Sequence, residues 1–243
     1  MTAASAVRAR ASALRVEALG DRALVVVLGE GIDPGVNARV HQLAALVRAR
    51  RLPGVTDLVP AYATLAVHYD PAPWAGRGVP PHQALRDELA AIWGRARPGS
   101  AQPPRQVAVP VCYGGEFGPD LEEVASRCGL PAAEVVARHT AAEYRVYMLG
   151  FSPGFAYLGG LDPVIAAPRR DTPRLKVPAG SVGIAGMQTG IYPLESPGGW
   201  QIIGRTPRRL FRPERAEPCL LAPGDTLRFV AVEPEAFRPE QGP

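Results

Sequence analysis

Several features that would place this chain in a common class of protein are missing from its sequence. In 243 residues, no apolar run approaches the roughly 18–20 residues of a membrane span, so we expect no membrane association. The three cysteines, at 112, 128 and 219, are odd in number and irregularly spaced. This argues against a disulfide framework and favours the reducing cytoplasm. The first 15 residues carry arginines but no apolar core, which predicts a frayed tail rather than a secretory signal.

Standard nucleotide and metal motifs are also missing. A Walker A loop needs Gly-Lys, but the only lysine, Lys176, follows Leu175, and no G-x-G-x-x-G occurs. The four histidines all lie within the first 139 residues. Only His139 and Glu143 share a helical face, and we interpret them as a solvated pair rather than as metal ligands. The sequence therefore predicts no phosphate loop and no metal site.

One hydrolase motif is present but incomplete. The stretch "GFSPG" at 150–154 matches the nucleophile elbow G-x-S-x-G. The elbow uses the N–H after the serine as an oxyanion donor, and Pro153 has none. No histidine follows Ser152 either, so the expected triad order is lost. We therefore do not expect a serine hydrolase.

Basic charge in this chain is almost entirely arginine. The formal net charge of +4 does not come with a basic helix face or with alternating aromatic and basic residues, so we expect no nucleic-acid binding. All 27 basic residues except Lys176 are arginine. A lysine against that background indicates a site that needs a compact ammonium, although survival at the surface by chance is an equal alternative.

Local patterns predict two domains. Turn signals and apolar periodicity predict an α+β domain of order ββαββα over 14–104, with helices at about 33–51 and 80–96. After the linker-like 97–105 we expect a strand at 106–113, helices near 120–128 and 131–142, and a strand at 144–151. Short apolar runs then alternate with Gly and Pro up to the last strand, which predicts a mainly-β barrel domain over 105–233.

The most unusual stretch is "VPAGSVGIAGMQTGIYPLESPGGW" at 177–200. Six of its 24 residues are glycine, yet only one is charged. Glycine lets backbone approach a ligand closely, and apolar residues between glycines can line a pocket. Aromatic residues and a basic run precede it: Phe151, Phe155, Tyr157, Arg169, Arg170, Arg174 and Lys176. We predict a ligand pocket here; the alternative is a set of tight barrel turns beside solvated basic residues.

Three segments carry a family resemblance: "GFSPGFAYLGGL", "PRLKVPAGSVGIAGMQTGIYP" and "SPGGWQIIGRTP". They resemble the KipI-like family, also called the 5-oxoprolinase B subunit or allophanate hydrolase subunit 1. The resemblance implies a cyclophilin-like barrel behind a small α+β domain. It further implies a KipA-like C subunit and a lactam-utilisation A subunit as partners. The implied reaction is the ATP-dependent opening of 5-oxoproline to glutamate, with Mg²⁺ accompanying ATP, and the implied class of substrate is a small lactam or amide.

The resemblance and the residue chemistry together give a candidate site. Lys176 and Arg174 are the candidate catalytic residues, because opening an activated amide develops negative charge. Trp200 is the candidate anchor for a partner subunit, without which we expect no activity. The candidate substrate-binding residues are Ser181, Gln188, Tyr192, Phe151, Phe155, Tyr157, Gly180 and Gly183.

Two other functions remain open at this point. One is a KipI-type inhibitor of a sporulation histidine kinase, which needs a docking surface but no chemistry. The other is a carboxyltransferase half-site of a biotin-dependent system that resembles urea carboxylase. This chain has no Met-Lys biotin attachment site, so the second alternative needs a biotinylated partner.

Overall fold

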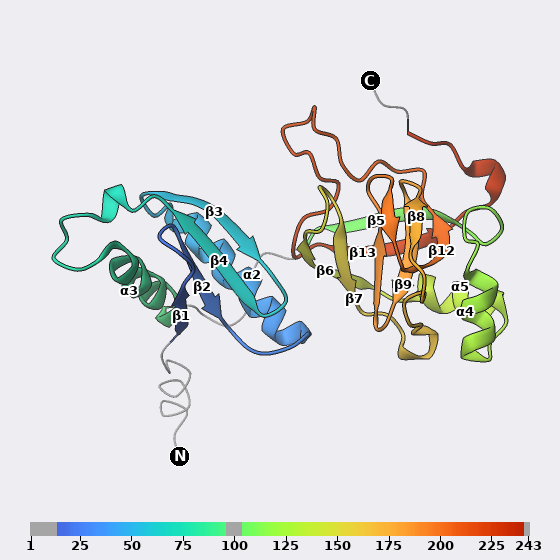
Figure 1. Ribbon diagram of the computed structural model, residues 1–243, viewed down its shortest axis with the longest axis horizontal. Coiled ribbons are helices and arrows are strands. Elements are labelled where there is room, and N and C mark those ends of the chain that lie inside the picture. The colour runs from blue at the N-terminus through green and yellow to red at the C-terminus, as the bar shows by residue number, and fades with distance from the viewer. Residues whose placement is uncertain (1–13, 96–103, 241–243) are drawn as a thin grey trace, which may run out of the picture. The chain divides into compact units, whose positions relative to one another are not determined.

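The computed structural model describes residues 14–95 and 104–240 (Figure 1). The chain divides into two compact units, with the boundary between Pro103 and Pro104. Within the described ranges, no helix is both long and apolar enough to cross a bilayer.

The first unit is a four-stranded antiparallel sheet with two helices, and its strand order is β1-β2-β4-β3. Helix α2 begins where the Asp33 carboxylate accepts the N–H of Val36 at 2.7 Å and Pro34 fixes the first turn. It ends at Arg51, which is left-handed with φ 47°. In chain order the elements are β1 Arg15–Ala18, β2 Ala23–Val27, α2 Pro34–Arg50, β3 Val55–Pro60, β4 Thr64–Tyr69, η1 Ala72–Trp74 and α3 Pro81–Gly94.

The core of this unit lies between the sheet and its helices. Leu24 and Val67 from the sheet are fully buried against Leu43 of α2 and Leu89 of α3. Trp74 is also fully buried, and its indole N–H donates to the carbonyl of Pro53 at 2.8 Å. Burial of large apolar side chains on one face of the sheet therefore holds the unit together.

The second unit is built around a closed barrel with the strand order β10-β7-β6-β13-β5-β12-β9. Strands β9 and β10 pair with each other and complete the closure. The first and last strands of the barrel, β5 and β13, pair in parallel from Thr226↔Gln106 to Ala231↔Val111. The prediction of a mainly-β barrel is confirmed. The barrel strands are β5 Gln106–Tyr113, β6 Tyr144–Leu149, β7 Ala156–Gly159, β9 Ser181–Ala185, β10 Gln188–Ile191, β12 Gln201–Arg205 and β13 Thr226–Ala231.

Helices and a small extra sheet flank the barrel. Apolar side chains such as Val124 and Val135 join the two longer helices to the barrel core. The first of these helices ends at Gly129, whose φ of 67° suits glycine at a helix C-terminus. The flanking elements are α4 Leu121–Cys128, α5 Ala132–Ala141, η2 Pro163–Ile165, the paired strands β8 Arg174–Val177 and β11 Ser196–Gly198, and η3 Pro234–Ala236.

The interpretation of His139 as a solvated residue is wrong. His139 is fully buried, and its ring stacks on Phe229 with 4.5 Å between the centroids. Its Nδ1 lies 2.7 Å from the Tyr113 hydroxyl, and its Nε2 lies 3.0 Å from Thr189 Oγ1. Thr189 donates its own proton to the carbonyl of Gly183 at 3.0 Å, so we assign the Nε2–H tautomer, with Tyr113 donating to Nδ1. Burial lowers the pKa of His139 to about 3, so the ring is neutral.

Candidate active site

Five predicted site residues form one aromatic cluster. Phe155 is its centre, with ring centroids 4.9 Å from Tyr157, 5.5 Å from Tyr192 and 5.7 Å from Trp200. The ring of Phe151 lies 5.4 Å from Phe155 on the outer side. These rings meet edge-to-face, which is a favoured geometry for aromatic pairs. The structure therefore brings together residues that the chain spreads over 50 positions.

Glycines in the 177–200 segment make room for these rings. A Cβ on Gly190 would lie 3.0 Å from Trp200 Cζ3 and 3.1 Å from Phe155 Cζ, and one on Gly183 would lie 3.1 Å from Trp200 Cβ. A Cβ on Gly198 would lie 2.4 Å from the hydroxyl of Tyr192. At these positions a larger side chain would collide with an aromatic residue. Close packing of aromatic rings against backbone is therefore one reason for the glycine content.

The Tyr192 hydroxyl is the group of the aromatic cluster that nearby arginine charges influence. Burial raises the pKa of Tyr192, an effect partly offset by the backbone N–H of Trp200 and by the charges of Arg169 and Arg174. Only 2% of Tyr192 is exposed. The phenol therefore remains protonated at neutral pH and can act as a hydrogen-bond donor.

Arg174 is held by a residue that the sequence analysis did not single out. Its guanidinium donates to both carboxylate oxygens of Asp120, at 2.8 and 2.6 Å, and Arg170 donates to the same carboxylate at 3.0 Å. The backbone N–H of Ile202 donates to Asp120 at 2.6 Å. Asp120 is buried, so its charge depends on these three donors. Arg174 thus connects β8 to the barrel strand β12 through one carboxylate.

Lys176 lies on β8 in a different environment. Its side chain is 79% exposed, and its Nζ lies 3.3 Å from Glu195 Oε1. Val177, the next residue, is fully buried in the aromatic cluster. Lys176 is therefore anchored beside the cluster by its backbone, while its ammonium group faces solvent.

The remaining predicted residues lie around the same hairpin. Ser181 begins β9, is 2% exposed, and accepts the N–H of Tyr192 with its carbonyl at 2.9 Å. Gln188 begins β10 and is half-buried. Gly180 has φ +84°, and a Cβ there would lie 2.4 Å from the carbonyl oxygen of Thr206. Glycine is thus required at Gly180 by its backbone surroundings.

Two aromatic residues of the cluster differ sharply in exposure. Trp200, the predicted anchor for a partner, has only 6% of its surface exposed. Phe151 is 67% exposed and adopts φ +68°, which is rare for a non-glycine residue. A strained backbone that presents an aromatic ring to solvent is typical of functional loops. Phe151 is therefore the aromatic side chain of the cluster best placed to contact another molecule.

Metal chemistry has no obvious centre in the described part of the chain. No group of three or more His, Cys, Asp or Glu side chains there is arranged to hold a metal ion. The sequence analysis did not single out Asp120, which precedes α4 and whose side chain makes no capping hydrogen bond. Its partners lie 50 to 82 positions away along the chain.

Comparison with known proteins places this architecture in a family. The family model described as "Carboxyltransferase domain, subdomain C and D" matches residues 14–221. The chain belongs to this family. It is 45% identical to the 5-oxoprolinase B subunit of Bacillus subtilis (strain 168) over 227 residues, which cover 92% of this chain and 95% of that protein. It is 44% identical to the 5-oxoprolinase B subunit of Escherichia coli O157:H7, over 87% of this chain and 93% of that one.

A solved structure shows the same fold. The crystal structure of TTHA0988 matches with a TM-score of 0.73 and 41% identity, over 87% of this chain. This chain spans 40% of the length of TTHA0988. The family model and the two 5-oxoprolinase B subunits confirm the predicted membership of the KipI-like family of 5-oxoprolinase B subunits.

Proposed function

We propose that this chain is the B subunit of an ATP-dependent 5-oxoprolinase, which opens 5-oxoproline to glutamate together with a KipA-like C subunit and a lactam-utilisation A subunit. The observation that carries the proposal is the 45% identity to the B subunit of Bacillus subtilis over nearly the full length of both chains. We also propose that the barrel is cyclophilin-like and that the isolated chain does not turn over substrate.

The reaction is consistent with a site that stabilises negative charge. A lactam is a resonance-stabilised amide, and ATP would supply the phosphoryl group that activates its oxygen. The chain has no Walker A loop, so we propose that ATP binds in a non-standard site or in one shared with a partner. Within this chain, the ammonium group of Lys176 is the proposed contact for the developing charge. Arg174, which is held by Asp120, would contribute to the electrostatic potential around this contact.

Exposure supports a site that a second subunit completes. Lys176 and Phe151 are 79% and 67% exposed respectively, whereas substrate sites normally enclose most of a small ligand. The buried rings of Phe155 and Tyr192 would form the rigid wall behind the ligand. Tyr157, Ser181, Gln188 and the backbone at Gly180 and Gly183 remain proposed ligand contacts at its edges. We assign the partner contact to Phe151, with Trp200 supporting it from the core.

A carboxyltransferase half-site is the second candidate, because the matching family model describes a carboxyltransferase domain. That function needs a carboxylated biotin carrier as donor, and it does not open a lactam. The two functions are separated by supplying 5-oxoproline and ATP to the assembled subunits with no biotinylated protein present. Glutamate formation under those conditions supports the 5-oxoprolinase.

Lys176→Arg tests the proposed site directly. The three subunits are co-purified, and glutamate formation from 5-oxoproline is measured with and without ATP. We expect the substitution to reduce kcat by about 10²–10³, because a planar guanidinium replaces a compact ammonium at the developing charge. Arg228→Lys on β13 is the matched control, since Arg228 is also exposed and lies 3.7 Å from an acid, Glu143. We expect it to keep wild-type activity.

The outcomes test the proposed function and the role of Lys176 separately. If the complex forms glutamate and Lys176→Arg stays within twofold of wild type, Lys176 is not in the site although the function holds. If the assembled subunits form no glutamate from 5-oxoproline, the proposed function is wrong. Full turnover by this chain alone would contradict the proposal that a second subunit completes the site.

A further inference from the structure

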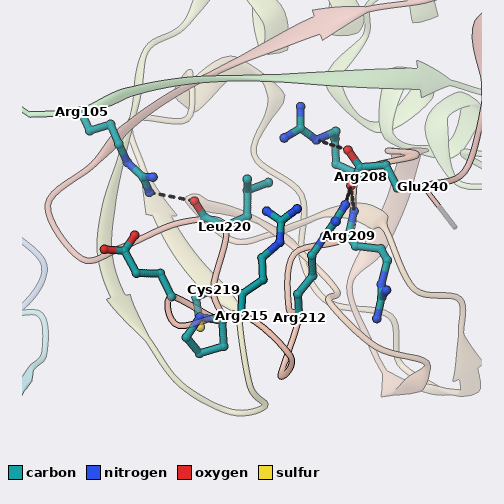
Figure 2. Close-up of a pocket in the computed structure, with 10 residues that line it drawn as sticks. Arg105, Arg208, Arg209, Arg212, Arg215, Cys219, Leu220 and Glu240 are labelled. Atoms are coloured by element: carbon teal, nitrogen blue, oxygen red, sulfur yellow. Dashed lines mark hydrogen bonds and ion pairs between the residues drawn. The ribbon is translucent and has the colours of Figure 1, made fainter. Parts of the chain in front are cut away.

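Five arginines of the barrel unit surround one pocket of about 220 Å³ (Figure 2). Most of them come from the loop that follows β12, and two acids, Glu217 and Glu240, share the lining. Like charges at this density repel one another unless anions separate them. The arginines are Arg105, Arg208, Arg209, Arg212 and Arg215.

Glu240 shows that the pocket wall already binds an oxyanion. Its carboxylate accepts the backbone N–H of Arg209 at 3.0 Å and a guanidinium N–H of Arg212, and its second oxygen lies 2.8 Å from Arg208 Nε. Burial raises the pKa of Glu240, but these donors outweigh it and the pKa is lowered. The carboxylate is therefore held ionised by donors that converge from one loop.

Donor capacity remains after Glu240 is bound. Arg209 Nη1 is buried and makes no hydrogen bond within the described residues; Glu214 Oε1 lies 3.8 Å away. The side chain of Arg215 has no hydrogen bond or ion pair in the described part of the chain, and Figure 2 shows it extending in the same direction as Arg212. Arg105, in contrast, is held by Asp225 and by the carbonyl of Leu220. The guanidinium of Arg215 is thus available to a ligand, whereas Arg209 Nη1 is buried.

We propose that this pocket binds a phosphate-bearing anion through Arg215, and that the negative charge of Glu240 on the pocket wall opposes that binding. The fork of a guanidinium matches the oxygens of a phosphate group, and charge-assisted hydrogen bonds are the strong ones. The pocket is smaller than the roughly 300–1,000 Å³ of sites for whole drug-sized ligands. It therefore fits one or two phosphate groups rather than a complete nucleotide. This inference stands on the pocket alone and does not need the proposed 5-oxoprolinase function.

The pocket loop packs against the loop that carries Phe151. A Cβ on Gly154 would lie 3.1 Å from the carbonyl oxygen of Leu210 and 3.0 Å from Phe211 Cβ. Phe211 in turn forms an isolated antiparallel β-bridge with Cys219, and Cys219 lines the pocket. An anion bound to Arg215 would therefore lie near the segment that packs against the Phe151 loop.

Isothermal titration of inorganic tripolyphosphate into the full chain tests the proposal, with Arg215→Gln, Glu240→Gln and Arg228→Gln as variants. We expect saturable 1:1 binding to wild type. Arg215→Gln should weaken it about tenfold, because a charge-assisted hydrogen bond is lost. Glu240→Gln should tighten it severalfold by removing a negative charge from the pocket wall. The control Arg228→Gln makes the same charge change outside the pocket, and we expect it to stay within twofold.

Further titrations identify the source of the phosphate. Binding of ATP but not of adenosine, with the same dependence on Arg215, assigns the pocket to the phosphate tail of a nucleotide. Binding of tripolyphosphate alone assigns it to a free polyphosphate. The proposal is overturned if neither wild type nor Glu240→Gln binds a phosphate compound. It is also overturned if Arg228→Gln weakens binding as much as Arg215→Gln does, because that result shows non-specific charge attraction.

Discussion

Acid should destabilise the barrel unit through one buried imidazole. His139 accepts a hydrogen bond from Tyr113 at Nδ1 and donates from Nε2 to Thr189, an arrangement that only the neutral ring supports. A proton added at Nδ1 would face the Tyr113 hydroxyl and place a positive charge in the core. The folded barrel therefore resists protonation at a pH where the unfolded chain accepts it.

The size of the effect follows from the two pKa values. The pKa of His139 is about 3 in the folded protein and 6.5 as an ordinary histidine. Above pH 6.5 neither state binds the proton, and the stability contribution is fully present. As the pH falls from 6.5 toward 3, only the unfolded state binds it, so the free energy of unfolding drops by about 1.4 kcal/mol per pH unit. Between pH 7 and pH 5 the expected loss is about 2 kcal/mol.

The assay must follow the barrel unit alone. Trp200 is in the barrel, whereas Trp74 and Trp93 are in the first unit, so a background with both of those replaced by Phe makes fluorescence report on the barrel. Urea unfolding is then measured at pH 7 and pH 5 in that background and with His139→Gln added. The His139→Gln variant should be less stable than its parent at pH 7. Its free energy of unfolding should not fall by the further ~2 kcal/mol between pH 7 and pH 5, because glutamine does not titrate.

The control removes a histidine that is not buried. His82 is exposed, so His82→Gln should keep the full pH dependence of the parent. If His139→Gln also keeps it, carboxylates rather than this imidazole cause the acid loss, and the reasoning fails. A ¹⁵N spectrum showing His139 protonated at pH 5 in the folded protein would refute it independently.

Two substitutions test the packing around the candidate site in the same fluorescence assay. Asp120→Ala should lower the free energy of unfolding by about 3–5 kcal/mol, because two arginines lose a buried counter-charge. Asp171 is exposed, so Asp171→Ala should be nearly neutral. Similar losses in both variants would show that Asp120 has no special structural role. Gly190→Ala should cost about 1–3 kcal/mol by forcing a methyl group against Trp200 and Phe155. A Cβ on Gly199 would lie 3.6 Å from the nearest atom, so Gly199→Ala should be tolerated. Equal losses of stability in Gly190→Ala and Gly199→Ala would contradict the packing argument.

Local sequence signals were sufficient for most individual elements. The strand expected at 106–113 is β5, and the helices expected near 120–128 and 131–142 are α4 and α5. The helix expected at about 33–51 is α2, whose start at Asp33 and Pro34 depends only on neighbouring residues. These features are determined within a few residues of chain, so a single sequence contains them.

Long-range contacts explain what the sequence did not reveal. His139 and Glu143 share a spacing typical of an exposed helix face, but the partners that bury His139 lie 26 and 50 positions away. Asp120 likewise depends on Arg174, 54 positions further on. The aromatic cluster was predictable as a group because its residues share a glycine-rich context. Which of its rings face solvent was not, because exposure depends on how segments distant in the sequence pack over each ring.

The parallel pairing of β5 with β13 affects how the protein can fold during synthesis. Ribosomes deliver the chain from its N-terminus, and domains generally fold as units. The first unit has all its strands and helices by Gly94, so it can form early. The barrel cannot close until Thr226–Ala231 arrives, because that strand lies between β5 and β6. Until then β5 has an open edge for more than 100 residues of synthesis. During this window the open edge of β5 can pair with other chains, so we expect the nascent barrel to be the part of the protein that aggregates most readily.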